Sequence, residues 1–562
     1  MAFENLISAL AAAPAERNFI TEWLDEDEQF TVTFGEFRRR ALAQAHALEQ
    51  HGVHDGDHVI ILMPQGICAM AVFAGAMTIG AIPSFLAYPN FKIEPAKYRS
   101  GLVGVLTNLR ARIVVIDSGF PEELLEHVQG ANSGTLLRAD ENTIAQNERP
   151  YPELNGSHLA FVQHSAGTTG LQKGVALTHA AVLRQLDHLA SVLKIQPEQD
   201  RIYSWLPLYH DMGLIACFML PLVYHLPLVM QSPMEWVMRP QNMLYAIGEH
   251  RCTLAWQPNF AFQFIARRTP REQRSSYDLS SLRALINCSE PVRARSIDEF
   301  QSAFAETGLK SEAIQSSYAM AENVFAVTQS DLANGPTRIA VDSKRFRNEH
   351  AVTLAENSSD TVEFVSSGHL LPNAEVRIVS DPGDNLPEGA VGEIYLRSDC
   401  LFEGYCNRPD LTAKALVDGW YRTGDLGFLL SGELYVAGRK KDLLIVGGEN
   451  LYPQDIEELV ASHSAIHDGR VIALGSYNND LGTEDIVVAA EVEDECLLSQ
   501  AAIIEREIRA IVVEGMGISV RTVYLKPTNW IVKSTAGKPA RAATMAKLQA
   551  EHPELNLEIG TR

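Results

Sequence analysis

Short apolar runs alternate with amphipathic stretches of helical length from the N-terminus to about residue 430. An unbroken apolar run of about four to eight residues is typical of a strand in a sheet that is covered on both faces. The clearest runs are 58–63, 111–116, 158–162 and 226–230. Because segments with helical periodicity separate such runs, the pattern predicts an α/β fold for this part of the chain.

The pattern changes toward the C-terminus. Two segments rich in glycine and strand-forming residues, 391–396 and 432–437, predict hairpins, and the basic link Gly438-Arg-Lys-Lys-Asp442 follows them. The elements expected beyond the link are helices at 455–462 and 498–514 and strands at 471–474, 485–492 and 520–525. We therefore expect a large N-terminal domain at 1–438 with several subdomains, a hinge at 439–442 and a small α+β domain at 443–562.

One apolar stretch, Met212 to Met230, is long enough to cross a bilayer. Pro221, His225 and Pro227 interrupt it, so it predicts a buried helix, a turn and a buried strand instead. The first residues lack a basic leader, so we expect no secretory signal and a cytoplasmic location.

Composition narrows the class of protein. A chain of 562 residues exceeds one hydrophobic core, so two or more domains are expected. The net charge of -23, from 47 basic and 70 acidic residues, disfavours a nucleic-acid partner. The 7 cysteines contain no Cys-x-x-Cys pair, so neither a zinc site nor a disulfide framework is indicated.

The segment from His164 to Gly174 concentrates glycine, hydroxyl and lysine side chains in one loop, with the sequence HSAGTTGLQKG. Glycines let backbone N–H groups approach an anion closely, and hydroxyls and an ammonium add further donors. The spacing differs from a Walker A loop, so the loop predicts polyphosphate binding of another kind. An exposed turn is the alternative interpretation.

Five segments, taken in order, resemble the adenylate-forming acyl-activating superfamily. They are the loop at 164–174, Asn287-Cys-Ser-Glu-Pro291, Ser317-Tyr-Ala-Met-Ala-Glu322, Tyr421-Arg-Thr-Gly-Asp425 together with the basic link, and Ser534-Thr-Ala-Gly-Lys538. The resemblance implies that a carboxylic acid is joined to the α-phosphate of ATP, with release of pyrophosphate, and then passed to a thiol. It also implies that the small C-terminal domain is mobile and rotates about Lys441 between the two steps.

The resemblance assigns roles to individual residues. Those for nucleotide binding are Ser165, Gly167, Thr168, Thr169, Gly170, Lys173, Asn287, Ser289, Glu290, Ser317, Tyr318, Ala319, Met320, Asp425, Arg439 and Lys538. It assigns catalytic roles to Lys538, His210 and Thr168. Fixed donors in such a site stabilise the charge that grows on the phosphoryl oxygens. Mg²⁺ falls to Glu322, because a hard cation prefers carboxylate oxygen. Each of these side chains could instead be structural.

The sequence defines the acid substrate and the thiol acceptor less closely than the nucleotide site. Trp205, Met212, Trp256, Asn259 and Phe260 are candidates for lining an acyl pocket, although most could equally be core residues. The stretches SWLPLYHDMGLI and RPQNMLYAIGEHRCTLAWQPNFAF resemble the fatty acyl-AMP ligase branch, as does an insertion at 338–347. That branch implies a fatty acid substrate and the phosphopantetheine of an acyl carrier protein as acceptor. The alternatives are an acyl-CoA or aryl-CoA ligase that uses free CoA, and a non-catalytic nucleotide-binding scaffold.

Overall fold

The structure is a computed structural model of the whole chain. It describes residues 3–24, 28–89, 95–131, 135–146, 151–165, 173–355, 361–381, 383–446, 449–478, 483–533, 539–555 and 557. The chain forms two compact units. The first comprises Met1–Thr337, Val365–Val376 and Leu396–Tyr421, and the second comprises Arg338–Phe364, Arg377–Tyr395 and Arg422–Arg562. The expected α/β fold is confirmed, whereas the domain boundary at 439–442 stays a prediction.

The largest sheet of the first unit has seven strands. Their spatial order is β13 (Ile314–Ser317), β12 (Ala284–Cys288), β11 (Leu254–Gln257), β9 (Ile202–Ser204), β10 (Leu228–Met230), β1 (Asn18–Trp23) and β2 (Gln29–Thr33). Strands β13 to β1 are parallel and β2 is antiparallel. Asn287 lies opposite Ser316 where β12 and β13 end, so two of the predicted nucleotide segments begin at one edge of this sheet.

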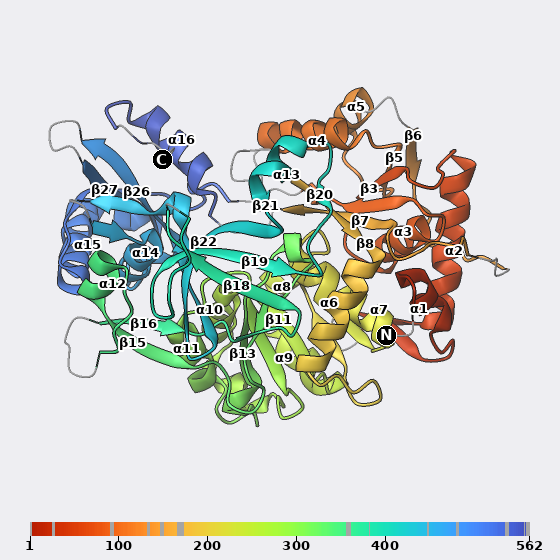
Figure 1. Cartoon of the computed structure of the whole chain (residues 1–562), viewed down its shortest axis with the longest axis horizontal. Helices are drawn as coiled ribbons and strands as arrows, with labels where there is room; N and C mark the ends of the chain where they lie inside the picture. Colours follow the sequence, from red (N-terminus) through yellow and green to blue (C-terminus); the bar gives the residue numbers. More distant parts are fainter. Residues whose placement is uncertain are drawn as a thin grey trace. The chain divides into compact units, whose positions relative to one another are not determined.

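A second, parallel sheet of the first unit shows why its strands are apolar throughout. Its spatial order is β4 (Ile82–Phe85), β3 (His58–Leu62), β5 (Ile113–Ile116) and β6 (Thr135–Arg138). Val59 and Ile61 belong to the core that includes helix α3 (Ile67–Met77), whereas Ile60 and Leu62 belong to the core that includes α4 (Pro95–Leu109). Alternate side chains of β3 therefore pack on opposite faces of the sheet. Helices α4 and α3 lie on either side of β3 in Figure 1.

A third sheet positions the predicted phosphate loop. Strands β7 (Leu159–Ser165) and β8 (Lys173–Thr178) are antiparallel, and β20 (Gly404–Tyr405) pairs with β8. The hydroxyl of Thr178 accepts a hydrogen bond from Ala181 N at 3.2 Å and caps helix α6 (His179–Val192). The strand before the loop and the helix after it are thus present as predicted, and residues 166–172 lie outside the described residues.

The apolar stretch at 212–230 forms a π-helix, η1 (Met212–Met219), then α7 (Leu220–Tyr224) and β10. His225 adopts φ 56° and ends α7 in the left-handed region. The predicted helix, turn and strand are confirmed, but the π winding was not foreseen. Within the described ranges, the structure contains no helix that is both long and apolar enough to cross a membrane.

The remaining helices of the first unit connect or cover these sheets. They are α1 (Leu6–Ala12), α2 (Phe34–Gln50), α5 (Glu122–Ala131), α8 (Pro233–Met238), α9 (Asn242–His250), α10 (Asn259–Arg268), α11 (Ala294–Ala303) and α13 (Pro409–Ala415).

The second unit contains the predicted C-terminal elements. These are α14 (Pro453–Ala461), β26 (Ile466–Asn478), β27 (Thr483–Val492), α15 (Ala501–Met516) and β28 (Val520–Lys526). A further helix, α16 (Arg541–Glu551), has no counterpart among the predicted elements. Strand β26 pairs antiparallel with β27, and β27 pairs parallel with β28. Apolar side chains of α14, α15 and the three strands share one core.

The second unit also contains two hairpin-like segments from the middle of the chain. The first is the hairpin of β22 (Trp420–Leu430) and β23 (Glu433–Arg439). The second is the predicted insertion, which folds as β15 (Arg338–Asp342), α12 (Ser343–Glu349) and β16 (Thr361–Val365). The Asp342 carboxylate accepts a hydrogen bond from Arg345 N at 2.9 Å, so it caps α12.

Candidate active site

Glu322, the predicted magnesium ligand, lies in the short helix η4 (Ala321–Asn323) and is 8% exposed. The hydroxyl of Tyr405 donates to its Oε1 at 2.8 Å, and Phe402 N donates to its main-chain oxygen at 2.9 Å. Lys173 Nζ, at the end of the phosphate loop, lies 4.6 Å from the centre of the Tyr405 ring. The fold thus brings Lys173 and Glu322, which are far apart in the sequence, to the same tyrosine.

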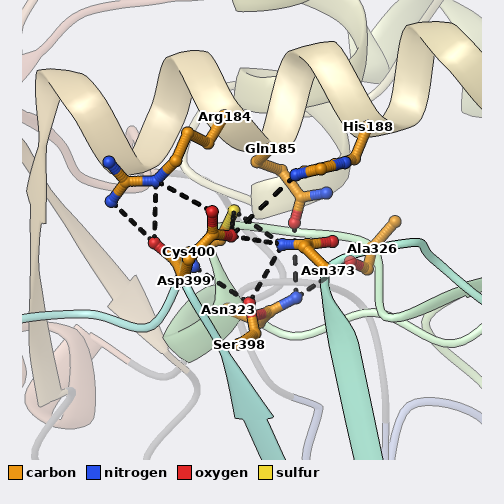
Figure 2. A network of polar contacts seen from close by, with 9 residues as sticks. All are labelled: Arg184, Gln185, His188, Asn323, Ala326, Asn373, Ser398, Asp399 and Cys400. Carbon is orange, nitrogen blue, oxygen red and sulfur yellow. Dashed lines mark hydrogen bonds and ion pairs between the residues drawn. The ribbon is translucent and has the colours of Figure 1, made fainter.

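A network of hydrogen bonds links the segments that lie next to the Glu322–Tyr405 contact in the sequence. Figure 2 shows Arg184, Gln185 and His188 projecting from α6 toward the segments around Asn323 and Asp399. Asn323 Nδ2 donates to Gln185 Oε1 at 3.3 Å and to Ala326 O at 2.9 Å. Arg184 Nε donates to Asp399 O at 3.0 Å. The helix that follows the phosphate loop is therefore bonded to the residue after Glu322 and to the segment that leads to Phe402 and Tyr405.

Asn373, in the turn directly before β18 (Ala374–Val379), joins the same network. Its Nδ2 lies 2.7 Å from Asp399 Oδ1 and 3.0 Å from Cys400 Sγ (Figure 2). Burial, with the Asp399 carboxylate adding to it, raises the pKa of the Cys400 thiol far above its usual range. Cys400 is therefore an uncharged structural thiol rather than a nucleophile.

The segment Asn287 to Glu290 leaves the edge of the large sheet. Asn287 is fully buried, and its Nδ2 donates to Asn259 Oδ1 at 2.9 Å. In the described part of the chain, Asn287 Oδ1 has no hydrogen-bond partner. Ser289 adopts φ 70°, which is unusual for a residue with a side chain, and Glu290 Oε2 accepts from Phe260 N at 3.1 Å. Asn287 Oδ1 is thus a buried acceptor, whereas Asn259 Oδ1 already accepts from Asn287 Nδ2.

The segment Ser317 to Met320 is held by contacts with the neighbouring segment 325–328. Ser317 Oγ donates to Thr328 O at 2.7 Å, and Tyr318 N donates to Thr328 Oγ1 at 3.0 Å. Ala319 pairs with Ala326, and Met320 N donates to Phe325 O at 2.9 Å. The Ser317 hydroxyl therefore shapes the segment, and the half-buried Tyr318 ring is the side chain that could stack on adenine.

In the second unit, Asp425 and Arg439 face each other across the β22–β23 hairpin. Ser431 and Gly432 form the turn with φ 53° and 78°, and a bulge between Leu426 and Gly427 shifts the register by one residue. Asp425 consequently lies opposite Arg439, whose Nε is 2.9 Å from Asp425 Oδ1. Asp425 is 7% exposed, so a fixed carboxylate and a planar cation form one polar pair.

The basic link forms a short 3₁₀ helix, η5 (Lys440–Asp442), with the predicted hinge residue Lys441 at its centre. Lys440 Nζ pairs with Asp381 and lies 3.0 Å from Glu393 Oε2. Asp442 Oδ2 lies 3.8 Å from Arg541 Nε. Ion pairs thus flank Lys441, and the hinge role stays a prediction.

Several predicted residues fall on parts of the chain that are not described. Gly167, Thr168, Thr169, Gly170 and Lys538 lie outside the described residues. Ser165 is described as the last residue of β7. The roles assigned to all of these residues stay predictions.

His210 lies directly before the π-helix. Its Nδ1 is 2.7 Å from Asp211 Oδ1, and the same oxygen accepts from Met212 N at 2.8 Å. The Asp211 carboxylate is therefore already engaged by an imidazole and a backbone N–H. This arrangement orients the His210 ring and leaves its Nε2 as the atom that could face a substrate.

Aromatic side chains from segments on both sides of His210 in the sequence form a cluster. Trp205 stacks on Trp236 with ring centres 3.6 Å apart and planes 2° apart, and the ring of Phe260 lies 6.3 Å from Trp205. Trp205, Met212 and Trp256 are buried, whereas Phe260 is 38% exposed. Trp236 is a member of this cluster that sequence reasoning missed, because nothing in its local pattern distinguishes it from a core residue.

His164, the first residue of the phosphate loop, has a neutral imidazole side chain. His164 is fully buried, and burial, with His58 as a smaller contribution, lowers the pKa of His164 to about 3. Neither ring nitrogen has a hydrogen-bond partner in the described ranges. The fold therefore keeps this position uncharged at neutral pH.

The chain is similar to known proteins over most of its length. The family model described as AMP-binding enzyme matches residues 8–406, and the chain belongs to this family. It is 29% identical over 549 residues to the long-chain-fatty-acid--AMP ligase FadD28 of Mycobacterium tuberculosis, covering 93% of this chain and 92% of the relative. It is 30% identical over 539 residues to the 4-hydroxyphenylalkanoate adenylyltransferase of Mycobacterium marinum, covering 91% and 85%.

A solved structure from a study of fatty acyl-adenylate ligases from E. coli and L. pneumophila matches with a TM-score of 0.88. The two chains are 25% identical, and the match covers 98% of each. Membership of the adenylate-forming enzymes, the α/β fold and the ligase class are therefore confirmed, and ATP is the nucleotide that this family uses.

Proposed function

We propose that the protein activates a fatty acid and transfers it to an acyl carrier protein. The acid carboxylate attacks the α-phosphate of ATP, which forms acyl-AMP and releases pyrophosphate. The phosphopantetheine thiol of the carrier then attacks the acyl carbon, which forms a thioester and releases AMP. The observation that supports this most is that Lys173 and Glu322 both contact Tyr405, because a cation and a carboxylate are the two kinds of group that bind an ATP–metal complex.

The residues present fit a magnesium ion that is shared with the nucleotide. Among the described residues, no group of three His, Cys, Asp or Glu side chains could hold a metal ion. Glu322 would supply a carboxylate oxygen, and phosphates and water would contribute to the shell, as is usual for Mg²⁺. When bound, Mg²⁺ neutralises charge on the phosphates and on the departing pyrophosphate.

Several other predicted residues would each have a chemical role toward the nucleotide. Asp425 has two carboxylate oxygens to accept from the two ribose hydroxyls, and Arg439 offers a planar fork to the ribose or the α-phosphate. Lys173 would bind the β- and γ-phosphates, and Asn287 Oδ1 is a buried acceptor suited to the adenine amino group. Lys538 would stabilise the charge on the α-phosphate as the carboxylate attacks.

The structure favours an acid without an ammonium group. An amino-acid substrate would need a carboxylate partner near His210, and Asp211 Oδ1 already accepts from Met212 N and lies 2.7 Å from His210 Nδ1. The neighbouring cluster of Trp205, Trp236 and Phe260 is aromatic instead. A fatty or arylalkanoic acid fits these surroundings, and both chemistries occur in the names of the relatives.

The insertion supports a carrier protein as acceptor. Within the second unit, Arg347 Nη1 donates to Met516 O at 3.2 Å, and the Phe346 ring lies 5.6 Å from that of Tyr452. His350 Nε2 lies 3.0 Å from Asn450 Nδ2 in β25 (Glu449–Leu451). The insertion is thus packed on C-terminal elements rather than a free loop, which suits a role in choosing the acceptor.

Four arginines at positions 267, 268, 271 and 274 are candidates for a basic patch that would bind an acidic carrier protein. Arg267 Nη2 lies 3.1 Å from Glu299 Oε2, and Arg274 donates to the main-chain oxygens of Ala266 and Thr269. Arg267, Arg271 and Arg274 line a groove of about 460 Å³ that also contains Asp298 and Glu299. Its mixed charge does not make it a basic landing patch for an acidic carrier.

ATP–pyrophosphate exchange with a panel of carboxylic acids tests the first half-reaction. We expect exchange with medium- to long-chain fatty acids and little with amino acids of similar size. Absence of exchange with every acid would favour the scaffold alternative, and preference for an amino acid would refute the substrate class.

A further inference from the structure

Tyr405 contacts two groups of the proposed nucleotide site at once. Its hydroxyl donates to Glu322 Oε1 at 2.8 Å, and its ring lies under the Lys173 ammonium at 4.6 Å. Both contacts are favourable, since a carboxylate is a strong acceptor and an aromatic face attracts a cation. One side chain therefore joins the proposed metal ligand to the proposed phosphate ligand.

Tyr405 is held firmly by other parts of the first unit. It pairs with Val175 of β8, its N–H donates to Thr412 Oγ1 at 2.9 Å, and the side chain is buried. Its ring packs 4.8 Å from that of Phe402, and its hydroxyl lies 3.4 Å from the Tyr421 hydroxyl. Because the backbone and ring are fixed without Glu322, the hydroxyl can orient the carboxylate instead of following it.

We propose that Tyr405 is a positioning residue for the ATP–magnesium complex. Its hydroxyl donates to Oε1 of Glu322, so that Oε2 is the oxygen that binds the metal. Its ring keeps the Lys173 ammonium near the phosphates. This inference rests on the proposed function of Glu322 and Lys173. It adds a third residue, from the Gly404–Tyr405 strand, that the motifs of the chain do not identify.

Tyr405→Phe removes the hydroxyl and keeps the ring. We expect the Mg²⁺ concentration for half-maximal ATP–pyrophosphate exchange to rise about 10-fold, as is typical when a residue that orients a metal ligand is removed. Calorimetric titration with ATP, without acid, should show weaker binding in Mg²⁺ and unchanged binding in EDTA. The calorimetric readout separates a metal effect from a loss of catalysis.

Tyr224→Phe is the matched control. The Tyr224 hydroxyl donates to Asp187 Oδ1 at the same 2.8 Å, in the same unit, and no nucleotide role is proposed for either residue. A general effect of losing a tyrosine–carboxylate bond would appear in both variants as a lower melting temperature. The Mg²⁺ dependence should change in Tyr405→Phe alone.

Tyr405→Leu removes the ring as well. Because Lys173 then loses its aromatic partner, we expect ATP binding in EDTA to weaken several-fold in this variant. Glu322→Gln provides the reference for the carboxylate. Tyr405→Phe should add little to the Mg²⁺ effect in the Glu322→Gln background, since both changes act on one interaction.

The outcomes separate the inference from the proposed function. If Glu322→Gln raises the Mg²⁺ requirement and Tyr405→Phe behaves like Tyr224→Phe, the positioning role is wrong and the metal ligand stands. If Glu322→Gln leaves the Mg²⁺ requirement unchanged, both the metal role of Glu322 and the positioning role of Tyr405 are overturned.

Discussion

Replacing Asp425 by asparagine tests the proposed ribose contact. The side chain keeps its shape, but one of the two oxygen acceptors becomes an NH₂ donor and the negative charge is lost. Because each carboxylate oxygen is proposed to accept from one ribose hydroxyl, the change removes one charge-assisted hydrogen bond to the nucleotide. We therefore expect the KM for ATP to rise and kcat to change less.

The magnitude follows from burial and pairing. A hydrogen bond to a charged group contributes about 1.5–3 kcal/mol, which corresponds to a rise in KM of about 10- to 150-fold. Loss of the pairing with Arg439 should change the free energy of unfolding little, because the Arg439 side chain is 54% exposed and water can solvate it. The melting temperature should therefore stay close to that of the unchanged protein.

The assay is ATP–pyrophosphate exchange with ATP and with 3′-deoxy-ATP. The unchanged protein should discriminate between the two nucleotides, and Asp425→Asn should discriminate much less. Asp485→Asn is the control, since Asp485 is also a carboxylate of the second unit, paired with Arg521 and bonded to Asn478 Nδ2 at 2.8 Å. An unchanged KM, or equal effects of both substitutions, would refute the ribose contact.

Three further predictions concern other parts of the chain. Lys538→Ala should lower the rate of adenylate formation by about 10²-fold or more, and near-normal pyrophosphate release would contradict the charge-stabilising role. Lys441→Pro should impair thioester formation more than adenylation, and equal loss in both half-reactions would contradict the hinge. Because burial holds the pKa of His164 at about 3, against 6.5 when exposed, the unfolded chain takes up the extra proton as pH falls below 6.5. The contribution of His164 to the free energy of unfolding should therefore fall by about 2 kcal/mol between pH 7 and pH 5. Urea unfolding of His164→Leu should show a loss smaller by this amount than that of the unchanged protein, whereas the exposed control His46→Gln should show the full loss.

The sequence predicts most of the fold because the strands differ from their surroundings in composition. The runs at 58–63 and 111–116 contain the observed strands His58–Leu62 and Ile113–Ile116, since both are buried on two faces and therefore apolar throughout. The π winding of Met212–Met219 could not be predicted in this way. An apolar segment carries the same pattern whether its turns are α or π, and packing decides between them.

The candidate site could be predicted only where a local motif marks it. Asp425 and Arg439 follow from their motifs, but their pairing depends on a bulge, because regular pairing from the turn would place Asp425 opposite Gly438. Tyr405 lies 83 residues from Glu322 and reaches it only through the pairing of β20 with β8. Such contacts come from tertiary structure and leave no periodic trace in the sequence.

The central claim is the formation of an acyl adenylate that a carrier protein, rather than free CoA, accepts. The most direct measurement is mass spectrometry of products after incubation with ATP, Mg²⁺, a fatty acid, and equal concentrations of CoA and a phosphopantetheinylated carrier protein. The account predicts acyl-AMP and an acylated carrier with little acyl-CoA. Predominant acyl-CoA would contradict the acceptor, and no acyl-AMP with any acid would contradict the proposed activity itself.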